Sequence, residues 1–415
     1  MTTTPCSGAL VQETAEAVAR HSYGKLVAFL ATRSGDVAAA EDALSEAFAE
    51  ALEHWPVKGC PSNPEAWLLT VGRRKLIDSA RRRKNEMPAE DYEFTETVAE
   101  AVVEQEIPDR RLGLMFACAH PAIDGAIRAP LMLQAVLGLD AARIASAFLM
   151  SPAAIGQRLV RAKTKIRQAG IPLKIPEREE LPERLETVLD AIYAVFSEGW
   201  LDPAGTDAAR RDLAEEAIFL CRLIVAMLPG EPEALGLLAL MLYAEARRKA
   251  RRSAEDAYIP LAEQDTAVWD QERIAEAEAA LLQARAAGLI GRFQLEAAIQ
   301  SAHIARRRDG VNNWAAVVKL YDGLLALTDS PVAAINRAVA LAEVEGPDAG
   351  LAALDAVSAD SRVRAYQPYW AARADLLART GASRLACAAY EIAIGLERDP
   401  SVRQALEQRR SALHD

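Results

Sequence analysis

The chain has 415 residues, too many for one ordinary hydrophobic core, and this length favours two to three domains. Hydrophobic residues make up 51% and charged residues 26%, a profile that excludes an intrinsically disordered protein. The formal net charge of −11 argues against nucleic-acid binding by the molecule as a whole, so that only a local cluster of cations could support it.

Cysteine spacing and hydropathy exclude several further classes. The five cysteines are scattered with no C-x-x-C spacing, which excludes a disulfide framework and a zinc knuckle. Cys118 and His120 lie close together, but no neighbour completes a tetrahedral set, so we expect neither a metal nor a cofactor. The N-terminus lacks the pattern of a signal peptide, and the most apolar run, 235–244, is too short to span a bilayer. We therefore expect a cytoplasmic protein without a membrane partner.

The first 55 residues predict two amphipathic helices. The first covers residues 10–31, and the second begins at Asp36, a favourable N-cap, and ends near Trp55. Apolar residues of the second helix recur at helical spacing: Val37, Ala40, Leu44, Phe48, Ala51 and Trp55. Its other face is acidic and carries Glu41, Asp42, Glu46, Glu50 and Glu53.

A third helix follows the turn-rich segment 56–63, because Asn63 is a good N-cap and Pro64 suits the first helical position. The spacing predicts a core-facing side made of Leu69, Gly72, Leu76 and Ala80, and a different face made of Trp67, Thr70, Arg74 and Arg81. The helix carries seven cations: Arg73, Arg74, Lys75, Arg81, Arg82, Arg83 and Lys84. Cations beside an exposed tryptophan suit single-stranded or melting DNA, although a basic helix end also suits the helix dipole and Trp67 could belong to the core.

The segment after this helix is strongly acidic, and a second basic helix follows it. Residues 86–106 contain eight acidic residues and no Lys or Arg, which indicates a linker. Residues 139–168 then predict two short helices joined by a tight turn, with Ser151 as the N-cap of the second. Its buried side is expected to hold Ile155, Leu159, Ala162 and Ile166, and its exposed side Gly156, Gln157, Arg158, Arg161, Lys163, Lys165 and Arg167. This pattern favours a helix-turn-helix whose N-terminal residues read base edges.

The remainder of the chain predicts alanine-rich helices. Residues 370–401 resemble one tetratricopeptide repeat, with small residues at the expected helix crossings (Ala374, Ala388, Ala393), Gly381 in the turn and Asp399-Pro400 at the end. Residues 314–357 resemble a looser copy, whereas residues 180–310 do not fit the repeat.

The order of these parts resembles a known family. The sequences EDALSEAFAEALEHW and NPEAWLLTVGRRKLIDSARRR, within residues 36–84, resemble region 2 of sigma-70 factors of the extracytoplasmic-function type, and residues 139–168 resemble their region 4. Together with IYAVFSEGW, NRAVALAEVEGPDAG and the terminal repeat, the whole chain resembles a subgroup that carries a tetratricopeptide-like extension. The resemblance implies an all-α fold with region 2 at residues 1–85, an acidic linker at 86–108, region 4 at 109–172 and the extension at 177–415.

The resemblance also implies partners and residue roles. Core RNA polymerase would be contacted at its β′ clamp and β flap, with Asp42, Glu46 and Phe48 serving the clamp. The −10 promoter element would be bound by the loop 57–63 and by Asn63, Trp67, Thr70, Arg73, Arg74 and Arg81. The −35 element would be bound by Gln157, Arg158, Arg161, Lys163 and Lys165. The extension could contact the sigma core and control it in cis.

Some positions depart from the family. It commonly has Asn where Arg74 stands and Gly where Leu149 stands, and a positive φ at Leu149 would cost about 1 kcal/mol. Gly156 stands where the family often has a side chain that contacts a base.

Three other functions agree less well with the sequence. A tetratricopeptide-containing transcriptional regulator that acts without polymerase would explain the helix-turn-helix but not the acidic helix 36–55. A protein-interaction scaffold would bind no DNA. An enzyme is disfavoured, because none of the five histidines lies in a nucleophile or metal constellation and no phosphate-binding glycine loop occurs.

Overall fold

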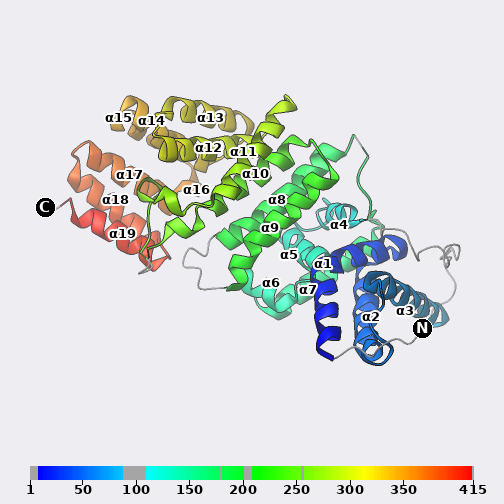
Figure 1. Cartoon of the computed structure of the whole chain (residues 1–415). Helices are drawn as coiled ribbons and strands as arrows, with labels where there is room; N and C mark the ends of the chain where they lie inside the picture. The colour runs from blue at the N-terminus through cyan, green and yellow to red at the C-terminus, as the bar shows by residue number, and fades with distance from the viewer. Residues whose placement is uncertain are drawn as a thin grey trace. The chain divides into compact units, whose positions relative to one another are not determined.

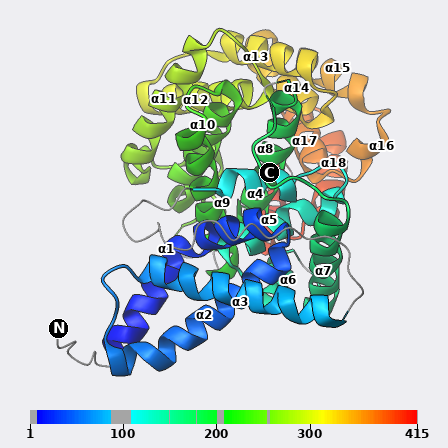
Figure 2. The ribbon, with the colours of Figure 1, turned by 90° about the vertical axis from the view of Figure 1, so that its right-hand side faces the viewer.

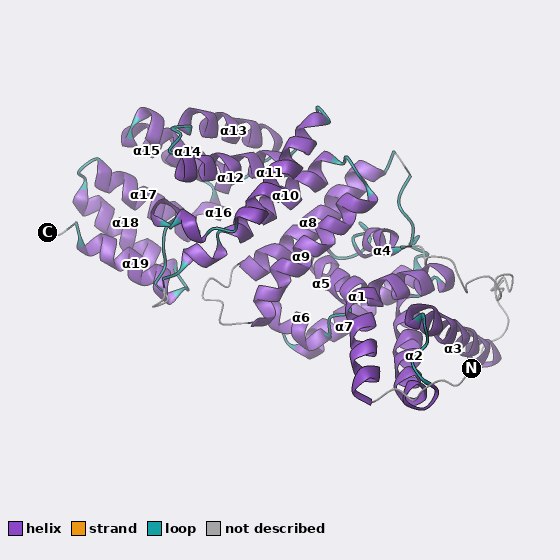
Figure 3. Cartoon of the chain, in the orientation of Figure 1, coloured by secondary structure: helices purple, strands orange, loops and turns teal. Residues whose placement is uncertain are grey.

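The computed structural model describes residues 8–86, 109–148, 150–177, 179–200, 208–253 and 257–413. Within these ranges the chain is helical and no strand occurs, so the predicted all-α fold is confirmed (Figure 3). The chain forms two compact units. Figure 1 colours the helices by residue number, from blue at the N-terminus to red at the C-terminus. Unit 1 comprises residues 1–199 and 209–217, and unit 2 comprises residues 200–208 and 218–415. The division therefore falls near residue 200, whereas the sequence places the start of the extension at 177.

The first three helices of unit 1 pack on one another (Figure 2): α1 (Gly8–Ser34), α2 (Val37–Lys58) and α3 (Pro64–Glu86). The Asp36 carboxylate accepts a hydrogen bond from Ala39 N, which satisfies a free amide at the start of α2 as expected. The predicted apolar stripe of α2 is buried except for Phe48, which is half-buried. Gly72 lets α3 approach α1, since a Cβ there would lie 3.1 Å from Leu30 Cδ1.

One core prediction for α3 is wrong. Leu69, Gly72 and Leu76 are buried as expected, but Ala80 is exposed. The reason is that the last turns of α3, which also carry the exposed Arg81 and Arg82, extend into solvent beyond the packed part of the helix.

Unit 1 continues with shorter helices: α4 (Arg111–Cys118), α5 (Gly125–Leu137), α6 (Ala141–Ala147), α7 (Pro152–Gln168) and α8 (Leu181–Trp200). Ser151 caps α7 by accepting from Ala154 N, and Pro152 occupies its first turn. The predicted apolar side of α7 is confirmed, because Ile155, Leu159, Ala162 and Ile166 are all buried. Arg184 on α8 donates to Phe116 O at 2.8 Å, so the start of α8 is bound to α4.

Helix α9 (Ala208–Met227) is divided between the two units, and unit 2 then consists of successive helices that pack on their chain neighbours. They are α10 (Pro232–Ala246), the 3-10 turns η1 (Arg248–Arg251), η2 (Leu261–Glu263) and η3 (Thr266–Val268), α11 (Gln271–Ala286), α12 (Arg292–Asp309), α13 (Trp314–Leu327), α14 (Pro331–Glu345), α15 (Pro347–Val357), α16 (Ser361–Arg364), α17 (Gln367–Arg379), α18 (Ser383–Leu396) and α19 (Pro400–Ser411).

The repeat-like segment 370–401 coincides with most of α17 and all of α18. Gly381 has φ +80 in the turn between them, a conformation that favours glycine. Ala374 and Ala393 are fully buried at the crossing as predicted, but Ala388 is exposed. The small residues that line the crossing on α18 are instead Ala386 and Ala389, because these positions face α17.

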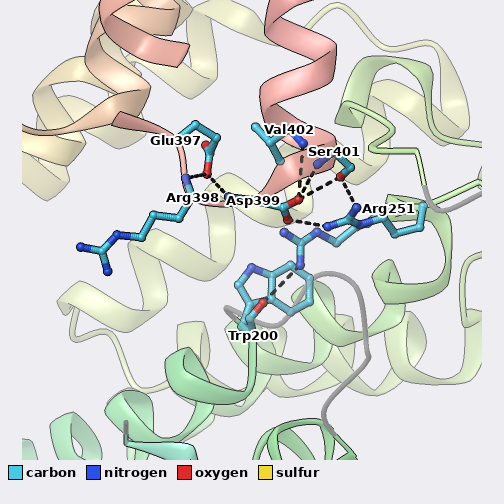
Figure 4. Close-up of polar contacts among 8 residues, drawn as sticks. Trp200, Arg251, Glu397, Arg398, Asp399, Ser401 and Val402 are labelled. Atoms are coloured by element: carbon cyan, nitrogen blue, oxygen red, sulfur yellow. Dashed lines mark hydrogen bonds and ion pairs between the residues drawn. The ribbon is translucent and has the colours of Figure 1, made fainter. Parts of the chain in front are cut away.

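The start of α19 is joined to η1, about 150 residues earlier in the chain (Figure 4). Asp399 caps α19 by accepting from Ser401 N and Val402 N, and its second oxygen accepts from Arg252 Nη2 at 2.5 Å. Arg252 also donates to the Ser401 hydroxyl. The neighbouring Arg251 lies 4.2 Å over the Trp200 ring and donates to its backbone oxygen. One carboxylate thus joins the start of the last helix of unit 2 to the segment that follows η1.

Candidate nucleic-acid interface

The acidic face of α2 is open to solvent at its centre. Asp42 and Glu46 are exposed one turn apart, while Phe48 lies half-buried beside them. Lys75 on α3 lies 3.4 Å from Glu46, and that carboxylate remains about half exposed. Carboxylates beside a half-buried aromatic ring can attract and position a basic helical partner.

Farther along α2, Glu50 joins the acidic helix to the basic one. Arg74 Nη2 donates to both Glu50 oxygens at 2.8 and 2.9 Å, and Lys75 Nζ lies 3.4 Å away. Arg74 is exposed on the face that the sequence predicts, but its guanidinium is directed at α2. Any ligand that takes Arg74 must therefore compete with Glu50.

We expect this pair to be visible as a lowered Glu50 pKa. Burial alone would raise that pKa, but the hydrogen bonds from Arg74 and Lys75 outweigh it and lower the pKa. The pair therefore stabilises the fold above the unfolded-state pKa of Glu50, and this contribution is lost as the pH falls through the folded-state value. In a carboxyl NMR titration the Glu50 midpoint should lie below the usual value of about 4.3. Arg74→Gln should raise it, whereas Arg81→Gln on the same helix should not; an unchanged midpoint in Arg74→Gln contradicts the assignment.

The predicted −10 residues occupy the start and the exposed face of α3. The Asn63 side chain accepts from Ala66 N as the helix cap, and the Thr70 hydroxyl donates to Ala66 O. Trp67 is half-buried, with its ring 5.4 Å from that of Trp55 in an edge-to-face arrangement. Trp55 is fully buried. Trp67 is thus held in place by the core while part of its ring stays accessible.

The remaining cations of α3 differ in exposure. Arg73 is half-buried, and burial followed by the like charge of Arg33 lowers its pKa. Arg81 is exposed. Trp67, Thr70 and Arg74 therefore share one accessible face of α3, whereas Arg73 lies closer to the side of α3 that packs on the other helices.

Helix α7 exposes most of the residues predicted to read the −35 element. Gln157, Arg158, Arg161 and Lys165 are exposed. Arg158, Arg161 and Lys165 border a hollow of about 370 Å³ whose other wall is formed by the start of α5, including Asp124 and Ile127. The sequence did not predict this second wall, because nothing in the local sequence indicates that residues more than thirty positions apart lie close together. Three cations around one hollow make a positively charged surface.

Lys163 was expected on the exposed side of α7, and this prediction is wrong. Its side chain is buried and forms an ion pair with Glu41 on α2. Arg167 Nη1, one turn later, donates to Asp36 Oδ2 at 3.1 Å. The two cations point toward α2 because the carboxylates of Glu41 and Asp36 lie within ion-pair distance of them. The sequence of α7 contains no pattern that predicts these partners.

Two sequence-based inferences fall on residues outside the described ranges. Leu149 in the turn before α7 is one, and residues 87–108 of the acidic segment are the other. Among the described residues no group of His, Cys, Asp and Glu is arranged to hold a metal ion, and Cys118 is fully buried. Nor does any helix in the described ranges have the length and apolar character needed to cross a bilayer.

Comparison with known proteins agrees with the first part of this description. Residues 18–86, which cover most of α1 and all of α2 and α3, match sigma-70 region 2. This domain supports a sigma-70 family factor. A sigma-70 region 2 implies binding to core RNA polymerase and to promoter DNA in transcription initiation, which is not an enzymatic role.

Two further comparisons match proteins without an assigned role. Residues 184–285 match a family of unknown function, DUF6596. The chain is 37% identical over 371 residues to the uncharacterized protein R00370 of Rhizobium meliloti (strain 1021), with 87% of each chain covered, so the two belong to one family. No solved structure matches the chain.

Proposed function

We propose that the chain is a sigma factor of the extracytoplasmic-function type, which binds core RNA polymerase and directs it to promoters. The observation that carries this proposal is the region 2 match over the helices that expose the acidic face of α2 and the basic face of α3. Unlike a regulator that binds DNA alone, a sigma factor needs both faces.

The polymerase would be bound mainly through α2. Asp42 and Glu46 would face the β′ clamp, with Phe48 adding an apolar contact. Their exposure supports this role, since a partner can reach both carboxylates without any rearrangement of α2. The second small module, α4–α7, would meet the β flap.

The −10 element would be bound by α3 and the loop before it. A base turned out of the stack would enter at residues 57–63, while Trp67 and Thr70 contact the strand and the basic residues Arg73, Arg74 and Arg81 hold its phosphates. The half-buried, edge-supported Trp67 favours this role, because its fixed ring loses little freedom when a base stacks on it.

The −35 element would be bound by α6 and α7 acting as a helix-turn-helix. Gln157, Arg158 and Arg161 lie in the first half of α7, where base edges are usually read, and Lys165 would meet phosphate. Lys163 can join them only after it leaves Glu41.

The salt dependence of DNA binding provides a test. If Arg158 and Arg161 each contact DNA, the double variant Arg158→Gln, Arg161→Gln should bind duplex DNA with a log–log salt slope smaller by about 2, since each lost phosphate contact removes nearly one unit. Fluorescence anisotropy across a salt series measures the slope. The matched control is Arg364→Gln, Arg384→Gln, at exposed positions on α16 and α18 in unit 2; an equal change there would show a general charge effect and contradict the assignment.

We further propose that unit 2 is a tetratricopeptide-like extension that controls the sigma core in cis. The helical hairpin α17–α18, with its αL glycine and buried alanines, supports the repeat assignment. A covalently attached regulator acts at roughly millimolar effective concentration, so even a weak contact would be populated.

Run-off transcription tests the proposal as a whole. Purified chain should co-elute with core RNA polymerase and support run-off transcripts from genomic promoters. Removal of the chain after Ala217, which keeps every residue of unit 1 and the bond between Arg184 and α4, should change the output. DNA binding without co-elution would instead favour a regulator that acts alone, and equal output with and without the extension would refute control in cis.

A further inference from the structure

Helix α18 lies between α17 and α19 and packs on them by one side only (Figure 1). Ala386 and Ala393 lie in the core that these three helices share. By contrast, the Leu385 side chain is 61% exposed, and Ile392, two turns later on the same face, is 41% exposed. Helix α18 therefore presents two aligned aliphatic side chains to solvent.

An apolar groove lies beside these two residues, between α17 and α18. It has a volume of about 190 Å³, and its apolar lining consists of Trp370, Leu377, Leu385, Ala388, Ala389 and Ile392. Arg373 also lines the groove, but it forms an ion pair with Asp355 of α15, so its charge is balanced within unit 2. An apolar side chain can therefore enter without leaving a guanidinium unpaired. Aligned aliphatic residues beside such a groove indicate a docking surface.

The exposed face of α18 is complementary to itself. In a twofold dimer with antiparallel helices, each residue meets one that lies equally far on the other side of the axis. An axis near Ala388 would place Leu385 of each copy against Ile392 of the other. Because Ala388 is small and exposed, the two helix backbones could approach each other closely at the axis.

Charged residues along one edge of this face favour the same arrangement. Arg384 and Glu391 are both exposed, and each directly precedes one of the two aliphatic residues. In the antiparallel dimer Arg384 of each copy would meet Glu391 of the other, whereas a parallel twofold pair would bring like charges together. Glu391 lies 3.8 Å from Arg410 of α19, but its side chain is 65% exposed and can accept a second cation.

We propose that α18 and the groove beside it form a self-association surface, which joins two copies of this chain through antiparallel α18 helices. The surface goes beyond the proposed function and does not depend on it. Helix α18 has 14 residues and is about 21 Å long, so the contact is smaller than a standard interface and we expect a dissociation constant of about 10 µM. At the submicromolar concentrations of a DNA-binding titration the chain would then be monomeric.

Sedimentation equilibrium of the full-length chain measures this dissociation constant. The wild type should change from monomer to dimer as its concentration rises from about 1 to about 100 µM. Leu385→Glu and Ile392→Glu should each raise the dissociation constant about 100-fold or more, because every dimer would then bury two unpaired carboxylates.

Exchange of the charged pair tests the antiparallel register. Arg384→Glu and Glu391→Arg should each raise the dissociation constant about tenfold, because two attractions per dimer become two repulsions. The double variant Arg384→Glu, Glu391→Arg should return it to within about threefold of wild type. Only a direct contact between the two positions across the dimer gives this restoration.

Matched controls make the same changes on α11. Leu282→Glu alters a leucine that is 66% exposed, and Arg285→Glu reverses an exposed arginine. Neither should change the dissociation constant by more than about twofold. Circular dichroism identifies the variants that keep the helical fold.

A disulfide cross-link tests the register even if a glutamate variant fails to fold. Ala388→Cys places a thiol at the expected axis, and oxidised glutathione should convert most of this variant into a covalent dimer. Leu282→Cys, on α11, should stay monomeric under the same treatment. The wild type, whose Cys60 and Cys387 are partly exposed, gives the background.

A chain that stays monomeric at about 100 µM overturns the proposal. So does a dimer that withstands both glutamate substitutions, an exchanged charge pair that restores nothing, or an Ala388→Cys variant that cross-links no faster than Leu282→Cys. If the chain is monomeric and Leu385→Glu instead weakens co-elution with core RNA polymerase, the groove binds polymerase rather than a second copy, and the proposal is wrong.

Discussion

Replacing both Asp42 and Glu46 with arginine is expected to lower run-off transcription about 100-fold. Each change replaces attraction to a basic partner surface with repulsion, and a loss of about 1.4 kcal/mol at each position gives this factor. Both side chains are exposed on α2 and neither contributes to its buried stripe, so the fold should survive. Co-elution with core polymerase should fail in parallel, which separates a binding defect from a defect in promoter opening.

The matched control changes the same charges on α1. Glu13 and Glu16 are also exposed and three residues apart, so Glu13→Arg, Glu16→Arg alters the net charge of unit 1 by the same amount. Transcription should stay within about threefold of wild type if the α2 face is specific. Equal losses in both variants would mean that overall charge, rather than this face, governs polymerase binding.

Asp399→Ala is expected to destabilise unit 2 by about 3 kcal/mol. The substitution removes the cap of α19, typically worth about 1 kcal/mol, and takes from the largely buried Arg252 the carboxylate that it bonds. Because Asp399 and Arg252 are far apart in the chain, their loss should release α19 together with the region around η1 (Figure 4). Chemical denaturation measures the energy, and hydrogen exchange should show increased exchange in α19.

Asp355→Ala provides the comparison within the same unit. Asp355 also forms an ion pair with an arginine, Arg373, but its side chain is mostly exposed and does not cap a helix. A surface pair of this kind contributes less than about 1 kcal/mol. If both variants lower the free energy of unfolding by the same amount, the contact between Asp399 and Arg252 stabilises unit 2 no more than a surface ion pair does.

Much of the local structure could be predicted, because it depends on interactions between residues that are close together in the sequence. Asp36, Asn63 and Ser151 cap the helices that the sequence assigns to them, since a side-chain oxygen three residues before a free amide needs no distant partner. Helical periodicity likewise identified the buried sides of α2 and α7. Periodicity failed at Ala80, which lies beyond the packed part of α3, and at Ala388, because Ala386 and Ala389 are the small residues that face α17.

The candidate site was predicted only in part, for a related reason. Arg158, Arg161 and Lys165 are exposed as expected, but Lys163 on the same helix is not. Side-chain spacing along α7 cannot distinguish them, because all are long cations on a helix with a narrow apolar side. What distinguishes Lys163 is Glu41, 122 residues earlier in the chain.

The helices, their caps, the acidic and basic faces and the resemblance to the sigma-70 family all follow from the sequence, because each depends on residues within a few turns of one another. Only the folded chain shows that Glu41 and Asp36 hold Lys163 and Arg167, that α5 supplies a wall beside Arg158, and that Asp399 joins α19 to the segment after η1. These contacts join residues distant in the chain, and the energy of an ion pair depends on distance and burial, which the folded chain sets.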